Sequence, residues 1–125
     1  MADELNELIV ADAEAWRGWL REHYDDEGAV WLVLAKKGTT EPTDLTYEGA
    51  VLEALCFGWI DGQGRRRDET THLQRFTRRR RRSPWSRSNV DRVERLTAAG
   101  RMHPAGLAEV DRARADGRWD AAYGL

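Results

Sequence analysis

Cysteine is almost absent from the sequence, because its 125 residues include only Cys56. A single cysteine excludes an internal disulfide and suits a reducing compartment. Long apolar runs are also missing, so no segment reaches the length of a membrane-spanning helix. The acidic start MADELNELIVADAEAW lacks the basic and apolar regions of a signal peptide. These absences predict a cytoplasmic protein without membrane insertion.

Sequence motifs of catalysis and metal binding are missing as well. The chain has no glycine-rich phosphate loop ending in Lys-Ser/Thr, no HExxH, no GxSxG and no paired-cysteine pattern. His23, His72 and His103 are far apart in the sequence, with no cysteine or carboxylate at ligand spacing. Cys56 lies on an apolar stripe beside Phe57, which is typical of a core residue rather than a nucleophile. We therefore expect no metal and no organic cofactor, and no sequence feature nominates an enzyme.

Charge is abundant, and its two signs are unevenly placed along the chain. Residues 1–61 contain 14 Asp/Glu and 4 Lys/Arg, whereas residues 62–125 contain 8 Asp/Glu and 16 Lys/Arg, so the two halves carry −10 and +8. Either the halves fold together and neutralise each other, or a basic surface concentrates anions. Of the 20 basic residues 18 are arginine, and a GC-rich codon bias produces the same excess without any selection for phosphate binding.

The hydrophobic periodicity predicts one α+β domain over residues 1–125, with about three short strands and four to five helices. Thr46 is a good N-cap for the second helix, and the pair Ser83 and Pro84 favours a helix start. The glycines at 62 and 64 favour turns. We expect Trp16, Trp19, Trp31 and Trp59 in the core. The predicted helices cover residues 11–23, 47–57, 83–99 and 104–116, and the predicted strands cover residues 29–35, 59–61 and 72–78.

Several blocks of the sequence resemble a known family in the order in which they occur. These blocks are WLREHY, GAVWLVLAKKG, LTYEGAVLEALCFGWIDGQ, LQRFTRRRRRSPWSRSNVDRVERL, AAGRM and ADGRWDAAY. Together they are similar to the YdeI/OmpD-associated family, also called bacteriocin-protection proteins. The resemblance implies protection against cationic antimicrobial peptides and association with an outer-membrane porin. It implies no reaction, cofactor or catalytic residues.

The stretch RFTRRRRRSPWSRSN, residues 75–89, is the leading candidate for a binding surface. Arginine forks match phosphate oxygens, and a helix N-terminus directly after the run favours an anion. An exposed tryptophan beside arginines is typical of sites for single-stranded nucleic acid. The candidate residues for binding an anion or nucleic acid are Arg75, Arg78, Arg79, Arg80, Arg81, Arg82, Trp85, Arg87 and Asn89.

Each of these residues also has a purely structural interpretation. Trp85 can pack beneath the start of the helix. The arginines can pair with Asp25, Asp26, Glu27, Asp44 or Glu48, and a run of like charges is often a solvated loop.

Asp61 and Gln63 form a second candidate, a buried polar site in the segment GWIDGQ. A carboxylate directly after an apolar Trp-Ile pair is expected to be partly buried and therefore to need a partner. We expect an Asp–Arg bridge that fixes the turn; general acid or base chemistry is the alternative.

Two hypotheses about function follow from these observations. The first is a non-catalytic binding protein that holds an anion or nucleic acid on a surface centred on the arginine run, residues 78–82. The alternative, which the family resemblance implies, is a protein-interaction or stress protein that meets a cationic peptide or protein partner through its acidic half. The sequence does not determine the oligomeric state.

Overall fold

The computed structural model describes residues 6–124 and contains a four-stranded sheet in the order β1-β2-β4-β3. β1 runs parallel to β2, whereas β2 and β3 both run antiparallel to β4. With the helices described below, this arrangement confirms the predicted α+β class. The strands are β1 (Glu7–Leu8), β2 (Ala29–Ala35), β3 (Trp59–Arg66) and β4 (Thr71–Arg78).

Local capping sets the starts of the first two helices. The Asp12 side chain accepts a hydrogen bond from the Ala15 amide (2.9 Å), and Thr46 Oγ1 accepts one from the Gly49 amide (3.1 Å). The helices are α1 (Ala13–His23), α2 (Tyr47–Cys56), α3 (Arg87–Ala98), α4 (Pro104–Ala115) and α5 (Arg118–Ala121). Thr46 is therefore confirmed as the cap of α2.

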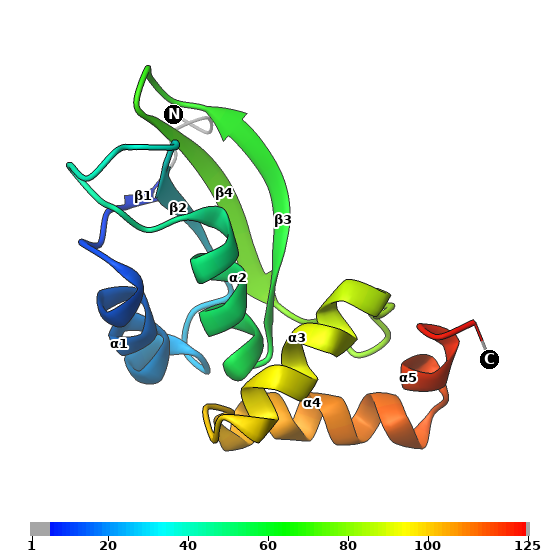
Figure 1. The fold of residues 1–125 in the computed structure, drawn as a ribbon. Helices are drawn as coiled ribbons and strands as arrows, with labels where there is room; N and C mark the ends of the chain where they lie inside the picture. Colours follow the sequence, from blue (N-terminus) through cyan, green and yellow to red (C-terminus); the bar gives the residue numbers. More distant parts are fainter. Residues whose placement is uncertain (1–5, 125) are drawn as a thin grey trace.

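The helices form two groups around the sheet (Figure 1). α1 and α2 cover one face of the strands, and α3, α4 and α5 gather beyond the end of the sheet at which α2 stops. Gly106 on α4 lets this group pack closely, because an added Cβ at Gly106 would lie only 2.3 Å from the Cys56 carbonyl oxygen at the end of α2. None of the helices in residues 6–124 is long and apolar enough to cross a membrane. The cytoplasmic location stays a prediction.

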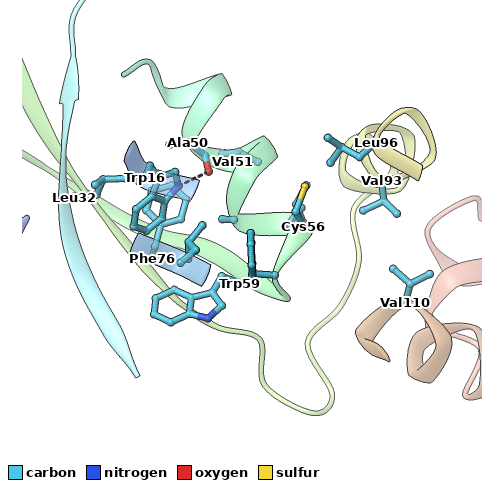
Figure 2. Packing of buried hydrophobic residues seen from close by; sticks show 14 of the residues in the cluster. Trp16, Leu32, Ala50, Val51, Cys56, Trp59, Phe76, Val93, Leu96 and Val110 are labelled. Atoms are coloured by element: carbon cyan, nitrogen blue, oxygen red, sulfur yellow. Dashed lines mark hydrogen bonds between the residues drawn. The ribbon is translucent and has the colours of Figure 1, made fainter. Parts of the chain in front are cut away.

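The core lies between the sheet and the first two helices and continues toward α3 and α4 (Figure 2). Trp16 and Trp59 are fully buried, as predicted, and Trp19 packs at the edge of the same cluster. Cys56 is fully buried, which confirms it as a core residue, and burial raises the pKa of its thiol.

Trp31 departs from the expectation of a core position. It pairs with Arg75 across β2 and β4, and directly opposite residues of two strands share a face of the sheet. Val30 and Phe76, the neighbouring pair, point to the core, so Trp31 points to the other face. There it is half-buried, and the Arg65 guanidinium lies 5.2 Å from its ring centroid.

β3 is longer than predicted because its glycines do not end it. The pairing with β4 shifts between Asp61 and Gly64, which marks a bulge, and then continues to Arg66. A Cβ at Gly64 would lie 3.1 Å from the Gln74 side chain, so the close approach of that side chain favours glycine here. The two-residue strand β1 was not predicted, because two residues are too few to show a period.

The turn between β3 and β4 is organised by Asp68. Its Oδ1 accepts hydrogen bonds from the amides of Thr70 (3.0 Å) and Thr71 (2.8 Å) and from the Thr71 hydroxyl (2.8 Å). The hydrogen bonds from Thr71, and then that from Thr70, lower the pKa of Asp68 from 3.8 to about 2.

We expect the acid stability of the protein to depend on this carboxylate. A carboxyl group whose pKa is lowered by folding stabilises the fold above its unfolded pKa and loses this effect as the pH falls through its folded pKa. The melting temperature of the wild type should therefore fall more than that of Asp68→Asn between about pH 4 and pH 2. Asp120→Asn, on an exposed helix position, is the control. Equal falls in the wild type and Asp68→Asn would contradict this role.

Candidate anion-binding surface

The arginine run lies in the connection between β4 and α3. Arg78 is the last residue of β4, and the Arg79 amide donates to the Gly58 carbonyl oxygen (2.9 Å). A tight turn follows, in which the Arg80 amide donates to Ser83 Oγ (3.0 Å) and the Ser83 amide donates to the Arg80 carbonyl oxygen (3.1 Å). This turn carries Arg80, Arg81 and Arg82, and we call these three residues the arginine turn.

The predicted helix start at Ser83 and Pro84 is wrong. α3 begins at Arg87, and its N-cap is Ser86, whose Oγ accepts a hydrogen bond from the Asn89 amide (3.1 Å). The chain stays outside the helix at Trp85, because that side chain packs against Trp119 of α5, with ring centroids 5.0 Å apart. The arginine turn is thus separated from the helix N-terminus, and the helix dipole gives it no support.

Arg79 and Trp85 lie inside the protein, with 8% and 7% of their surfaces exposed. The Arg79 guanidinium lies over the Trp85 ring at 3.7 Å from the ring centroid, a close cation–π contact. Asn89 is buried too, and its Oδ1 accepts a hydrogen bond from Arg92 (2.7 Å). These three side chains anchor the connection; the Trp85 ring, between Arg79 and Trp119, offers no open face to a base.

The other candidate arginines are exposed. Arg78 Nε donates to the Glu27 carbonyl oxygen (2.9 Å), and Arg87 Nε lies 3.6 Å from Asp91 Oδ1. Within residues 6–124 the structure gives no ion pair to Arg75 or to any member of the arginine turn.

The acidic half of the chain finds its partners among other arginines. Among the described residues, 6–124, three ion pairs join the two halves, each between a glutamate of the acidic half and an arginine of the basic half. They are Glu7–Arg67 (2.9 Å), Glu48–Arg92 (2.8 Å) and Glu53–Arg101 (2.8 Å). The two halves therefore neutralise each other in part, and the arginine turn takes no part in these three ion pairs. Arg82 does have a carboxylate nearby, because Arg118 and, to a smaller extent, Arg82 lower the pKa of Asp116.

Asp61 does not form the predicted Asp–Arg bridge. Its Oδ2 accepts a hydrogen bond from the Tyr47 hydroxyl (2.6 Å), and the structure gives Asp61 no ion pair within the described residues. Burial, and then this hydrogen bond, raise the pKa of Tyr47 to about 12, so the phenol keeps its proton at neutral pH. Gln63 lies in the bulge of β3 with its side chain exposed, so it is not the buried polar residue that was predicted. The predicted Asp–Arg bridge is therefore wrong, because the partner of the Asp61 carboxylate is the hydroxyl of Tyr47 from α2.

One cluster of side chains of metal-binding types was not identified from the sequence. His23, Asp26 and Glu27 bring one ligand atom each within 4.8 Å of one another, and His23 Nδ1 lies 3.1 Å from Asp26 Oδ1. The signal was available in the i, i+3, i+4 spacing at the end of α1. Three groups, two of them on exposed side chains, fall short of the four ligands of a structural zinc site. The cluster therefore supports no metal proposal.

Comparison with known proteins replaces the family suggested by the sequence blocks. A family model described as "Domain of unknown function (DUF8412)" matches residues 8–109. No curated protein and no solved structure matches the chain. The resemblance to the YdeI/OmpD-associated family is therefore wrong.

The structure gives a physical reason for this error. The blocks GAVWLVLA and EALC build β2 and α2, whose side chains are mostly buried. Such blocks reflect packing requirements rather than a site. The porin partner and the protection against cationic peptides rested on that resemblance alone, and they lose their support with it.

Proposed function

Because the chain belongs to the DUF8412 family, whose function is unknown, we propose a function from the residues of the chain itself. We propose that the protein binds nucleic acid through the arginine turn. The observation that carries the proposal is the set of three consecutive exposed arginines without an ion pair in residues 6–124. Arg79, directly before this turn, is buried, and its guanidinium packs on the Trp85 ring.

The surface extends from the arginine turn to the end of β4. Arg78, the last residue of this strand, is exposed and adds a further cation. Arg75 is exposed in the middle of β4, on the face of the sheet that it shares with Trp31, and we do not include it in this surface. Arginine donates in a planar fork that matches phosphate oxygens, and each phosphate contact releases counterions from the nucleic acid.

The form of recognition follows from the burial of Trp85. Since this ring is covered and Phe76 is also buried, residues 75–89 offer no aromatic face that is free to stack on bases. We therefore propose binding to the phosphate backbone, with little preference for sequence and with a strong dependence on salt.

A salt titration tests the proposal. Anisotropy of labelled duplex DNA, single-stranded DNA and RNA should give a log–log plot of affinity against salt that is linear. Replacing Arg80, Arg81 and Arg82 together by serine should lower the magnitude of the duplex slope by about 3 and weaken binding at every salt concentration. Tryptophan fluorescence should change little on binding, because Trp85, the tryptophan near the arginine turn, is buried.

The matched control removes three cations elsewhere. Arg21, Lys37 and Arg95 are exposed and outside the arginine run, so their joint replacement by serine changes the net charge equally. The control variant should keep a slope close to that of the wild type. The proposal fails if the wild type does not bind at low salt, or if both triple variants lose the same affinity.

A further inference from the structure

A pocket of about 180 Å³ lies where four segments meet at the end of the sheet. Tyr24 after α1 and Phe57 after α2 give it aromatic walls. Gly58 and Ala105, the latter in the first turn of α4, complete this part of the lining. Gly58 has a φ of +80°, and a Cβ there would lie 3.1 Å from the Ala105 carbonyl oxygen, so glycine permits this close approach. The pocket does not include the arginine turn.

Arg79 forms a cationic part of the lining. It is more than nine-tenths buried, and its Nε has no hydrogen-bond partner in the described chain. Its Nη1 makes one long hydrogen bond, to the Pro84 carbonyl oxygen (3.4 Å). Burial lowers the pKa of Arg79 to about 10, which still leaves it charged at neutral pH. A buried guanidinium with so few acceptors is costly unless a ligand or water supplies them.

Two carboxylates line the same pocket. Glu109 Oε2 accepts a hydrogen bond from Arg112 (2.7 Å), whereas its Oε1 is buried and has no donor within residues 6–124. Asp25 is exposed and has no hydrogen bond or ion pair in that part of the structure. Arg79 forms no ion pair with either of them. The charge of Glu109 partly offsets the lowering of the pKa of Arg79 by burial. The pocket lining thus carries charged groups of both signs, which can meet a negative and a positive group of one ligand.

We infer that this pocket binds a small zwitterion of the amino-acid type, with its carboxylate toward Arg79 and its ammonium toward Asp25 and Glu109. A phosphate dianion is disfavoured by the two carboxylates, and a simple cation is disfavoured by Arg79 and Arg78. A cavity of about 150 Å³ accommodates a benzene-sized molecule, so this volume suits a small amino acid with an apolar side chain against the aromatic walls.

Calorimetric titration with L-leucine tests this inference, and two analogues separate its charges. N-acetyl-L-leucine lacks the ammonium, and L-leucinamide lacks the carboxylate. L-leucine should bind, and each analogue should bind at least about tenfold more weakly, because each leaves a charged group of the pocket unpaired. Inorganic phosphate should not compete. Absence of L-leucine binding, equal binding of an analogue, or displacement by phosphate would each overturn the inference.

The variants that test the site keep Arg79, because this buried side chain also packs on Trp85 and supports the fold. Asp25→Asn removes the exposed carboxylate and should weaken L-leucine binding about tenfold. Ala105→Leu should fill the pocket and abolish binding while the circular dichroism spectrum stays that of the folded protein. Glu14→Gln, an exposed carboxylate on α1 outside the pocket, is the control and should bind L-leucine like the wild type. Unchanged binding by Asp25→Asn and Ala105→Leu would contradict the site.

Arg78 belongs both to the proposed nucleic-acid surface and to the pocket lining, whereas the arginine turn belongs to the surface alone. The triple serine variant of the arginine turn should keep the affinity of the wild type for L-leucine, and Ala105→Leu should keep its affinity for duplex DNA. Loss of both activities in either variant would show that the two sites are not separate, which contradicts the inference.

Discussion

Replacing Trp16 by alanine should lower the free energy of unfolding by about 4 kcal/mol. Trp16 is fully buried, and its ring contacts Trp19 and Phe76 with centroid distances of 5.4 and 5.5 Å. Its Nε1 donates a hydrogen bond to the Ala50 carbonyl oxygen (3.0 Å), which ties α1 to α2 (Figure 2). The variant removes the packing, the hydrogen bond and the contact between two helices, and it leaves a large cavity. Urea denaturation followed by circular dichroism measures the loss.

Trp16→Phe separates the ring from its hydrogen bond. This variant keeps most of the apolar volume and removes only the donor to Ala50, so it should lose less than half as much stability as Trp16→Ala. A loss below about 1 kcal/mol in Trp16→Ala would mean that the core closes over the missing ring, and would contradict the packing described here.

Replacing Glu53 by alanine should lower the free energy of unfolding by about 3 kcal/mol. Glu53 is a buried carboxylate of α2 that accepts from Arg17 Nη1 and Arg101 Nη2, both at 2.8 Å. Arg17 Nη2 also donates to the Arg101 carbonyl oxygen (2.8 Å), so the group joins α1, α2 and the segment after α3. Without the carboxylate, two neighbouring guanidinium groups lose their common partner and repel each other.

A surface ion pair gives the matched control for Glu53. Glu48→Ala removes a partner of Arg92 on an exposed part of α2, and it should cost no more than about 1 kcal/mol. The triple variant Arg17→Met, Glu53→Leu, Arg101→Met should recover much of the stability lost in Glu53→Ala, because it leaves no uncompensated charge. Equal losses in Glu53→Ala and Glu48→Ala would contradict the role of the buried group.

Within the candidate surface, the sequence identified the cations but not their environments. Five neighbouring arginines are chemically alike in the sequence, yet Arg79 lies under Trp85 while Arg80, Arg81 and Arg82 face solvent. The difference arises because β4 ends at Arg78 and the Arg79 amide then bonds to Gly58, which turns that one side chain inward. A contact between residues 58 and 79 has no local sequence signal.

Much of the fold was determined by the sequence itself. The apolar run of residues 29–35, the cap at Thr46 and the proline in the first turn of α4, Pro104, act over a few neighbouring residues, so β2, α2 and α4 follow from local patterns. The absence of known catalytic sequence motifs is likewise evident from the sequence alone.

Only the tertiary structure decided which charged and aromatic side chains remain available. It buried Trp85 against Trp119, paired Asp61 with Tyr47, and brought Asp25, Arg79 and Glu109 to one pocket. Each of these arrangements joins residues from separate elements, and their energies depend on burial and distance, which are set when the sheet and helices pack. Residue type therefore specified the charges of this protein, and packing specified which of them can meet a ligand.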